Sequence, residues 1–233
     1  YEIAWNLASI LAVFGTAVAR SMFPSISQLS AQAEAEAIAG HVTDSLRFAG
    51  LFLIPGFVGA VLLGGEVLRI YGSQFTKGGT VLIVLVGARL VYTYQHQFVN
   101  ALNAIDRPEL AFRVESIFVL VNLTLNVLLV LRFGWIGAAV ATAVSTLVAT
   151  VLAYRALAAQ VPFDLPLATL GRQVLASLVM GAAVHAGQVV LPGTLLVVIG
   201  LVFLGAVVYL ITVVVLSRTI RQVILTNLPI DIR

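Results

Sequence analysis

Long apolar runs separated by short polar segments dominate the chain. A helix needs roughly 20 mostly apolar residues to cross about 30 Å of hydrocarbon at 1.5 Å per residue. Seven runs reach that length, approximately Ala4–Phe23, Leu46–Ile70, Thr80–Leu102, Leu110–Leu131, Trp135–Leu157, Leu170–Leu191 and Thr194–Leu216. They are continuously apolar and lack the alternation of a membrane β-strand. The pattern predicts an all-α fold, a polytopic membrane helical bundle with about seven transmembrane helices.

The segments between the runs carry residues that end or turn helices. They are Phe23-Pro24, Tyr71-Gly72, Asp106–Pro108, Phe133-Gly134, Pro162–Pro166 and Leu191–Gly193. Short connections make successive helices antiparallel neighbours, so one compact bundle is expected. The longer connection, residues 25–45, is Ala-rich and predicts a solvated interfacial helix. Pro55 and Gly56 predict a bend or hinge inside the second run.

The composition excludes several classes of protein. With 61% hydrophobic and 10% charged residues, the chain is far more apolar than a soluble domain. A net charge of +3 on so few charges does not indicate a nucleic-acid surface. The absence of Cys excludes disulfides, iron–sulfur clusters and cysteine nucleophiles. Because the three histidines lack metal-ligand spacing, we expect no metal and no cofactor.

Basic residues beside the ends of the runs predict the orientation. One side collects nine of them: Arg20, Arg47, Arg107, Arg113, Arg155, Arg172, Arg218, Arg221 and Arg233. The other side has three: Arg69, Lys77 and Arg132. The first side is therefore expected in the cytoplasm, together with the C-terminus. Tyr1 would then lie outside, so we expect an odd number of helices upstream, in the missing part of a longer protein.

A polar stripe crosses the third run. Arg89 is the one basic residue near the middle of a run, where a charge costs between about 3 and more than 10 kcal/mol unless it faces protein or water. Thr93, His96, Asn100 and Asn103 follow it at helical spacing on one face. Glu115, Asn122 and Asn126 form a second stripe on the next run.

Both stripes are counted from the Asp106 turn, which places equal counts at equal depth. Arg89 should then lie near Asn122, and Glu115 near His96 or Gln97. One interpretation is structural: the groups hydrogen-bond one another between helices, at about 0.6 kcal/mol per bond. The other is functional: they line a hydrated cavity for a polar cargo. Structure is the favoured explanation for His96, and function for Arg89, since such weak bonds do not offset a buried guanidinium.

Features of an enzyme are missing from the sequence. No paired carboxylates stand at a membrane edge, and no Gly-rich phosphate loop with Lys-Ser/Thr occurs. The sequence therefore favours a transporter over an enzyme.

Four segments carry a resemblance to a known family. They are Arg20–Ser30 (RSMFPSISQLS), Leu68–Gly72 (LRIYG), Leu102–Pro108 (LNAIDRP) and Phe133–Thr142 (FGWIGAAVAT). Together they resemble the C-terminal half of polysaccharide and lipid-linked oligosaccharide flippases of the multidrug/oligosaccharidyl-lipid/polysaccharide exporter superfamily. The match is specific over about residues 1–157. The last two runs agree only in hydrophobicity and placement.

This resemblance implies the C-lobe of a two-lobed transporter in the cytoplasmic membrane. Residues 1–157 would be C-lobe helices with the linker 25–45, residues 158–217 two additional helices, and residues 218–233 a cytoplasmic tail. The implied cargo is a lipid-linked glycan, and membrane lipids and the glycosyltransferases or polymerase of the same pathway are the implied partners. Cavity cations of such flippases would engage its pyrophosphate or acidic sugars, a role that Arg89 is placed to fill.

Candidate cavity residues are therefore Arg89, His96, Asn100, Asn122 and Asn126, and Glu115 is the candidate for ion or proton coupling. Two alternatives remain open from the sequence: a multidrug or cation-coupled exporter of the same fold, and a membrane-embedded glycosyltransferase or polymerase.

Overall fold

The computed structural model describes residues 2–10, 13, 35–217 and 221. Residues 2–10 are helical. Further along lie α2 (Ala35–Ala49), α3 (Leu53–Arg69), the 3-10 helix η1 (Ser73–Gly78), α4 (Gly79–Ala104), α5 (Pro108–Ala158), α6 (Leu167–Val190) and α7 (Leu195–Leu216). The first half of the predicted linker, much of the first predicted span and nearly all of the tail lie outside the described residues.

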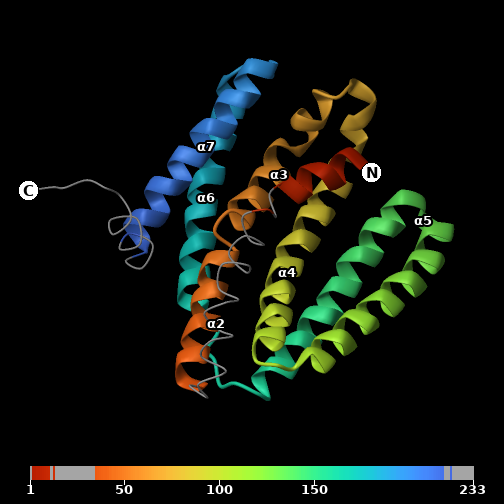
Figure 1. Cartoon of the computed structure of the whole chain (residues 1–233). Coiled ribbons are helices and arrows are strands. Elements are labelled where there is room, and N and C mark those ends of the chain that lie inside the picture. Colours follow the sequence, from red (N-terminus) through yellow and green to blue (C-terminus); the bar gives the residue numbers. More distant parts are fainter. Residues whose placement is uncertain (1, 11–12, 14–34, 218–220, 222–233) are drawn as a thin grey trace, which may run out of the picture.

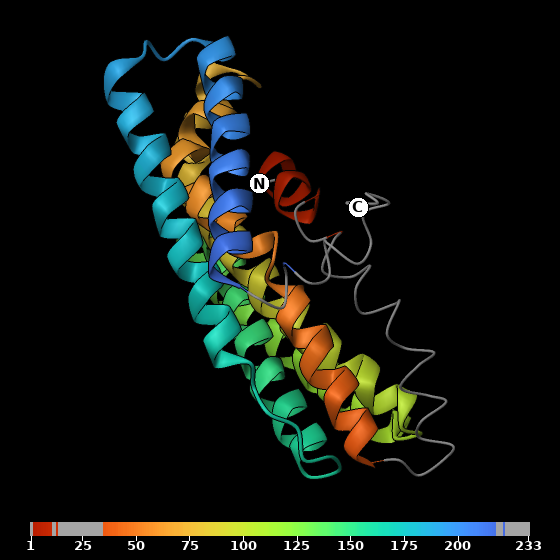
Figure 2. The same ribbon diagram turned by 90° about the vertical axis from the view of Figure 1, so that its left-hand side faces the viewer.

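The described helices form an elongated bundle (Figures 1 and 2). In Figure 1, α6 and α7 lie side by side at one flank, α3 and α4 occupy the middle, and α5 forms the other flank. The helical segment 2–10 lies against α3 and α4, where Ala4 and Ala8 are buried with Leu68 and Leu85. The all-α membrane bundle predicted from the sequence is confirmed.

Within the part of the chain that the structure describes, four helical stretches are long and apolar enough to cross a membrane: Glu36–Arg69, Pro108–Ala158, Leu167–Val190 and Leu195–Leu216. The stretch Pro108–Ala158 has 51 residues, more than twice the length of one span. The 26 residues of α4 suffice in length, but its polar stripe lowers its hydropathy. The count of seven spans stays a prediction.

The helix α5 is a hairpin. Gly134 has φ 59° and ψ −139° inside an otherwise helical segment, a conformation open to Gly and strained for other residues. The chain reverses there (Figure 1), giving a first arm (residues 108–133) and a second arm (residues 135–158). The break predicted at Phe133-Gly134 is confirmed.

Small residues let the second arm pack closely. Along it, every fourth residue is buried: Gly137, Ala141, Ser145, Ala149 and Ala153. Lipid supplies little hydrophobic drive between helices, so close approach of backbones is what stabilises such contacts. A Cβ on Gly137 would overlap the backbone of Leu129 in the first arm. This face of small residues therefore forms a close helix contact.

The turn between α4 and α5 caps a helix. Asp106 adopts a left-handed conformation with φ 58°. The N–H of Arg107 donates to the carbonyl of Leu102 at 2.9 Å, and the N–H of Asp106 donates to that of Asn103 at 3.2 Å. These two bonds form a Schellman motif. Pro108 then starts α5 at a position that needs no N–H.

The predicted second span is interrupted, as Pro55 and Gly56 suggested. Residues 50–52 form a turn between α2 and α3. The structure differs from the sequence analysis at the start of this span. Residues 35–45 were expected to be part of a solvated interfacial helix; they are helical within α2, but Ile38 and Val42 are buried in the same core as Phe98 of α4.

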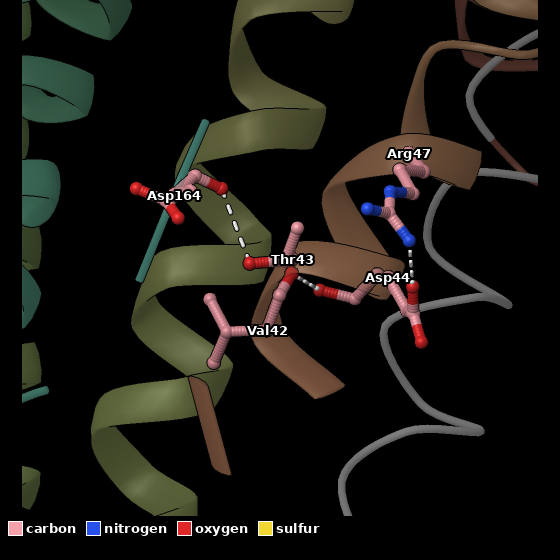
Figure 3. A network of polar contacts seen from close by, with 6 residues as sticks. Val42, Thr43, Asp44, Arg47 and Asp164 are labelled. Carbon is pink, nitrogen blue, oxygen red and sulfur yellow. Dashed lines mark hydrogen bonds and ion pairs between the residues drawn. The ribbon is translucent and has the colours of Figure 1, made fainter. Parts of the chain in front are cut away.

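The pair α6 and α7 is fastened to the rest of the bundle by its connecting loop. Thr43 of α2 donates a hydrogen bond to the backbone oxygen of Asp164 at 3.1 Å, as Figure 3 shows. In the same view, Arg47 pairs with Asp44 at 2.7 Å. Phe163 of the loop packs against the rings of Phe98 and Tyr154. These contacts fix where α6 begins.

Two further hydrogen bonds hold α6 and the loop after it. Gln188 donates to the backbone oxygen of Leu62 in α3 at 3.0 Å, and Arg69 donates to the carbonyl of Gly193. Residues of α6 and α7 share a core with Leu63 of α3. The buried contacts of α6 and α7 make these two helices an integral part of the bundle.

We predict that Gly137→Ala lowers the free energy of unfolding by about 1–3 kcal/mol, because the added Cβ meets backbone that cannot move aside. Thermal unfolding in detergent measures the effect. Gly40→Ala is the matched control: a Cβ there has nothing within 4 Å, so it should be neutral or stabilise by about 0.5–1 kcal/mol. Equal stability of the two variants would contradict the close approach of the arms.

The orientation can be tested at the two ends of α6. Gln160 lies before the start of α6 and Thr194 after its end, and both are exposed. The chain has no Cys. From the arginine asymmetry, Thr194→Cys should react with a membrane-impermeant thiol reagent added outside the cell, and Gln160→Cys should react only after lysis. The opposite labelling pattern would invert the topology.

Candidate functional site

The polar residues predicted as a site come to lie in three separate groups. The first surrounds Arg89 on α4, the second lies between the two arms of α5, and the third bridges α4 and α5. We describe each from its own contacts.

Arg89 faces the N-terminal helical segment. Its guanidinium Nη2 donates to Oγ of Ser9 at 2.9 Å, and its Cζ lies 3.9 Å from the ring centroid of Trp5. Trp5 and Ser9 are four residues apart, so they share one face of their helix. A ring below a cation contributes about 0.5–2 kcal/mol, more when water is excluded. The guanidinium is therefore held between two helices.

The rest of this face continues along α4. Tyr92 lies with its ring centroid 5.7 Å from Cζ of Arg89 and 5.9 Å from the ring of His96. His96 Nδ1 and Asn100 Nδ2 are 3.1 Å apart in a hydrogen bond. All four residues are partly exposed. We call Arg89, Tyr92, His96 and Asn100 the α4 polar face.

Thr93 and Asn103 were also predicted on this stripe, but they are not part of the α4 polar face. Thr93 is 0% exposed, and its hydroxyl donates to the backbone oxygen of Arg89 at 3.0 Å. It therefore serves the helix itself rather than a surface. Asn103 is exposed near the end of α4.

The second group lies between the arms of α5. Asn122 Nδ2 donates to Oγ of Ser145 at 2.9 Å. Asn126 Nδ2 donates to both the backbone oxygen and Oδ1 of Asn122, at 2.9 and 3.0 Å. These partners differ from the sequence expectation, which placed Asn122 beside Arg89. Equal depth did not bring the two together because Arg89 points toward the N-terminal segment.

The third group contains the one carboxylate among the predicted site residues. Gln95 Nε2 donates to Oε1 of Glu115 at 3.1 Å. The sequence had paired Glu115 with His96 or Gln97 at the same depth. The depth was right, but the partner is the neighbouring residue, which is 0% exposed and faces α5.

An apolar groove of about 430 Å³ lies beside the first half of α4. Its lining comes from the N-terminal segment, α3, α4, α6 and α7, and includes Leu82 and Val86 of α4. Spacings of four and three residues place Leu82, Val86 and Arg89 on the same side of α4. Arg89 lies about one turn beyond Val86 on this side of the helix and is not itself a lining residue of the groove. An apolar groove followed by polar side chains along one helix would suit a ligand that is apolar at one end and anionic at the other.

Sequence reasoning missed the residues that hold this site. Trp5 and Ser9 were treated only as part of a span, although their spacing of four gives a mixed aromatic and polar face. Gln173 of α6, which is 0% exposed, was also missed. A lone Gln in an apolar run is the signal that could have found it, because a buried amide requires partners.

Comparison with known proteins decides the family. The chain matches the family Lipid II flippase MurJ over residues 4–205. It belongs to this family. The flippase family predicted from the four sequence segments is confirmed.

Two relatives of this MurJ-family chain come from Haloferax volcanii. The probable low-salt glycan biosynthesis flippase Agl15 is 34% identical over 230 residues, which cover 98% of the chain and 48% of the relative. The probable flippase AglR is 39% identical over 176 residues, covering 74% of the chain and 37% of the relative. The chain spans about half the length of these relatives or less.

A solved structure of lipid II flippase MurJ in an inward closed conformation matches with a TM-score of 0.76. The match covers 96% of the chain and 46% of that structure at 20% identity. The MurJ-family chain therefore has the fold of about half of such a flippase.

We predict an energetic coupling between Gln95 and Glu115. A double-mutant cycle with Gln95→Ala and Glu115→Ala should give about 0.6–1.7 kcal/mol, the range for hydrogen bonds between membrane helices. Unfolding of the purified protein in mixed micelles measures it. The same cycle with Asn100→Ala in place of Gln95→Ala should give none, because Asn100 bonds His96. A coupling confined to the Asn100 cycle would refute the pairing.

Proposed function

We propose that this chain is part of a flippase that moves lipid-linked oligosaccharide precursors across the cytoplasmic membrane for cell-surface glycan assembly. Support comes from the family, from the names of the two Haloferax relatives and from the junction of groove and polar face on α4. A multidrug exporter is not favoured by these relatives. In this proposal the protein transports its cargo and does not transform it.

The observation that carries this proposal is the position of Arg89. A lipid-linked glycan joins an apolar chain to a sugar through phosphate. The apolar groove would receive part of the chain, and Arg89, one helical turn beyond Val86, would bind the phosphate. A guanidinium offers two parallel donors to phosphate oxygens, whereas Lys offers a point charge. Trp5 and Ser9 orient that guanidinium before cargo arrives.

The other predicted residues take supporting roles in this proposal. His96 and Asn100 continue the α4 polar face and would hydrogen-bond the first sugars. Asn122 and Asn126 would contact sugars from α5. Glu115 is the group that would couple transport to an ion or proton, because it is a carboxylate inside the bundle.

The surroundings of the chain follow from the same proposal. The C-terminus would lie in the cytoplasm, as the arginine asymmetry indicates. Residues 1–157 would belong to the C-lobe and residues 158–217 would add two helices, with residues 218–233 as a tail. Membrane lipids surround the bundle, and the glycosyltransferases or polymerase of the pathway would supply or consume its cargo.

Substitution of Arg89 tests the cargo-binding role. Arg89→Ala and Arg89→Gln should reduce surface glycan per inserted transporter by about 10-fold or more, since charge-assisted hydrogen bonds contribute about 1.5–3 kcal/mol. Arg89→Lys should retain part of the transport. Surface glycan and membrane-inserted protein are measured in the same cells.

The exposed Arg132 supplies the matched control, and Arg132→Ala should transport normally. A purely structural Arg89 gives another outcome: less protein in the membrane, with normal glycan per inserted copy. That result for Arg89→Ala would end the proposed role of Arg89.

A further inference from the structure

The break between α2 and α3 leaves a backbone carbonyl without its usual partner. Pro55 has no N–H, so it cannot bond to Leu51, and its ring crowds that carbonyl. The N–H of Leu51 donates to Phe48 at 3.1 Å and so does not serve Arg47, its partner in a regular helix. The oxygen of Arg47 therefore needs a donor from elsewhere.

A side chain of α6 supplies that donor. Gln173 Nε2 donates to the backbone oxygen of Arg47 at 2.8 Å, and the Gln173 side chain is 0% exposed. An unpaired backbone group that is shielded from water is unfavourable. One side chain from α6 thus completes the hydrogen bonding of α2 at its broken end.

The packing around Gly50 leaves no space at this break. A Cβ there would overlap the Tyr94 hydroxyl of α4 and lie 3.1 Å from Oε1 of Gln173. Both of these oxygens are buried and have no hydrogen-bond partner among the described residues. Buried polar atoms in proteins nearly always have a partner, so two unpaired oxygens make this junction an exception in the packing of the bundle. Three elements meet at this point, α2, α4 and α6.

We propose that Gln173 is a positioning residue that holds α2 against α6 and releases it during transport, so that α2 swings about Gly50 relative to α3. This inference rests on the proposed flippase function. Val42 and Leu46 of α2 pack in one core with Phe98 of α4. A swing of α2 therefore also moves the end of the bundle next to Asn100, the last residue of the α4 polar face. Gln173 touches no cargo and acts through the helix it holds.

Spin labels on α2 and α6 test directly whether Gln173 holds α2 against α6, a contact called the latch below. Gly40 and Gly171 both have room for a new side chain, with nothing within 4 Å of a Cβ, so Gly40→Cys and Gly171→Cys carry the labels. In the full-length protein, Gln173→Met should add longer label-to-label distances to the distribution measured by double electron–electron resonance. It should also change the transport rate by about 5-fold, the effect of one lost hydrogen bond.

Gln188→Met is the matched control. Gln188 lies on the same helix and also donates to a backbone oxygen, that of Leu62, but Leu62 lies within the continuous helix α3. The control should leave the label distances unchanged. If both variants give the wild-type distribution, or if both broaden it equally, the latch is refuted.

A second pair of variants approaches the pivot from its other side. Gly50→Ala should displace α2 and lower transport, because its Cβ meets both the Tyr94 hydroxyl and Cδ1 of Ile54. Adding Tyr94→Phe and Ile54→Val removes both atoms and should restore the label distances and transport. Failure of this pair to rescue either property would overturn the proposal.

The distances and the transport assay separate this inference from the proposed function. If the wild-type protein flips no lipid-linked glycan, the proposed function fails, while the label distances still report whether Gln173 holds α2. If Gln173→Met broadens the distances and transport is unchanged, the function stands and Gln173 is not a positioning residue for it.

Discussion

Every peptide group inside a bilayer must find its hydrogen-bond partner within the protein, because lipid offers none. The fold satisfies this constraint in a different way at each place where a helix stops. At Asp106, a Schellman motif turns the chain and closes its own carbonyls. Between α2 and α3 the N–H of Leu51 donates to Phe48 rather than to Arg47, and a glutamine from α6 donates to the Arg47 oxygen instead. The position of α6 is tied in this way to a defect in a helix far away in the sequence.

Polar side chains also find their hydrogen-bond partners within the protein. The residues that the sequence places on two facing stripes divide into small groups, each with its own partners: Arg89 with Ser9, Asn122 with Ser145 and Glu115 with Gln95. Each of these bonds also stabilises the contact between two helical segments. The α4 polar face differs because all its members are partly exposed and share one side of α4 with residues that line an apolar groove. The polar groups therefore have unequal claims to a role in cargo binding.

Much of the architecture could be predicted from the sequence, because a membrane-spanning helix requires a long apolar run of nearly fixed length. The predicted edges of α4, α6 and α7 agree with the structure within a few residues, since hydropathy, Pro and Gly directly mark where helices start and end. The partners of side chains were harder to predict. Counting from the Asp106 turn gives depth, but a step of one residue rotates the side chain by about 100°, which is why Gln95 and not its neighbour meets Glu115. The contact of Arg89 with Trp5 was beyond this method, because it joins helices separated by about 80 residues with no shared turn.

The buried small residues of the second arm of α5 recur every four positions, whereas a helix turns every 3.6. Over the sixteen residues from Gly137 to Ala153 the stripe therefore winds about 160° around the arm. Its start faces Leu129 of the first arm, and its end lies in the core shared with α2 and α4. The contact face therefore spirals around the second arm. Rotation of the arm about its axis, or translation along that axis, would break contacts at both ends.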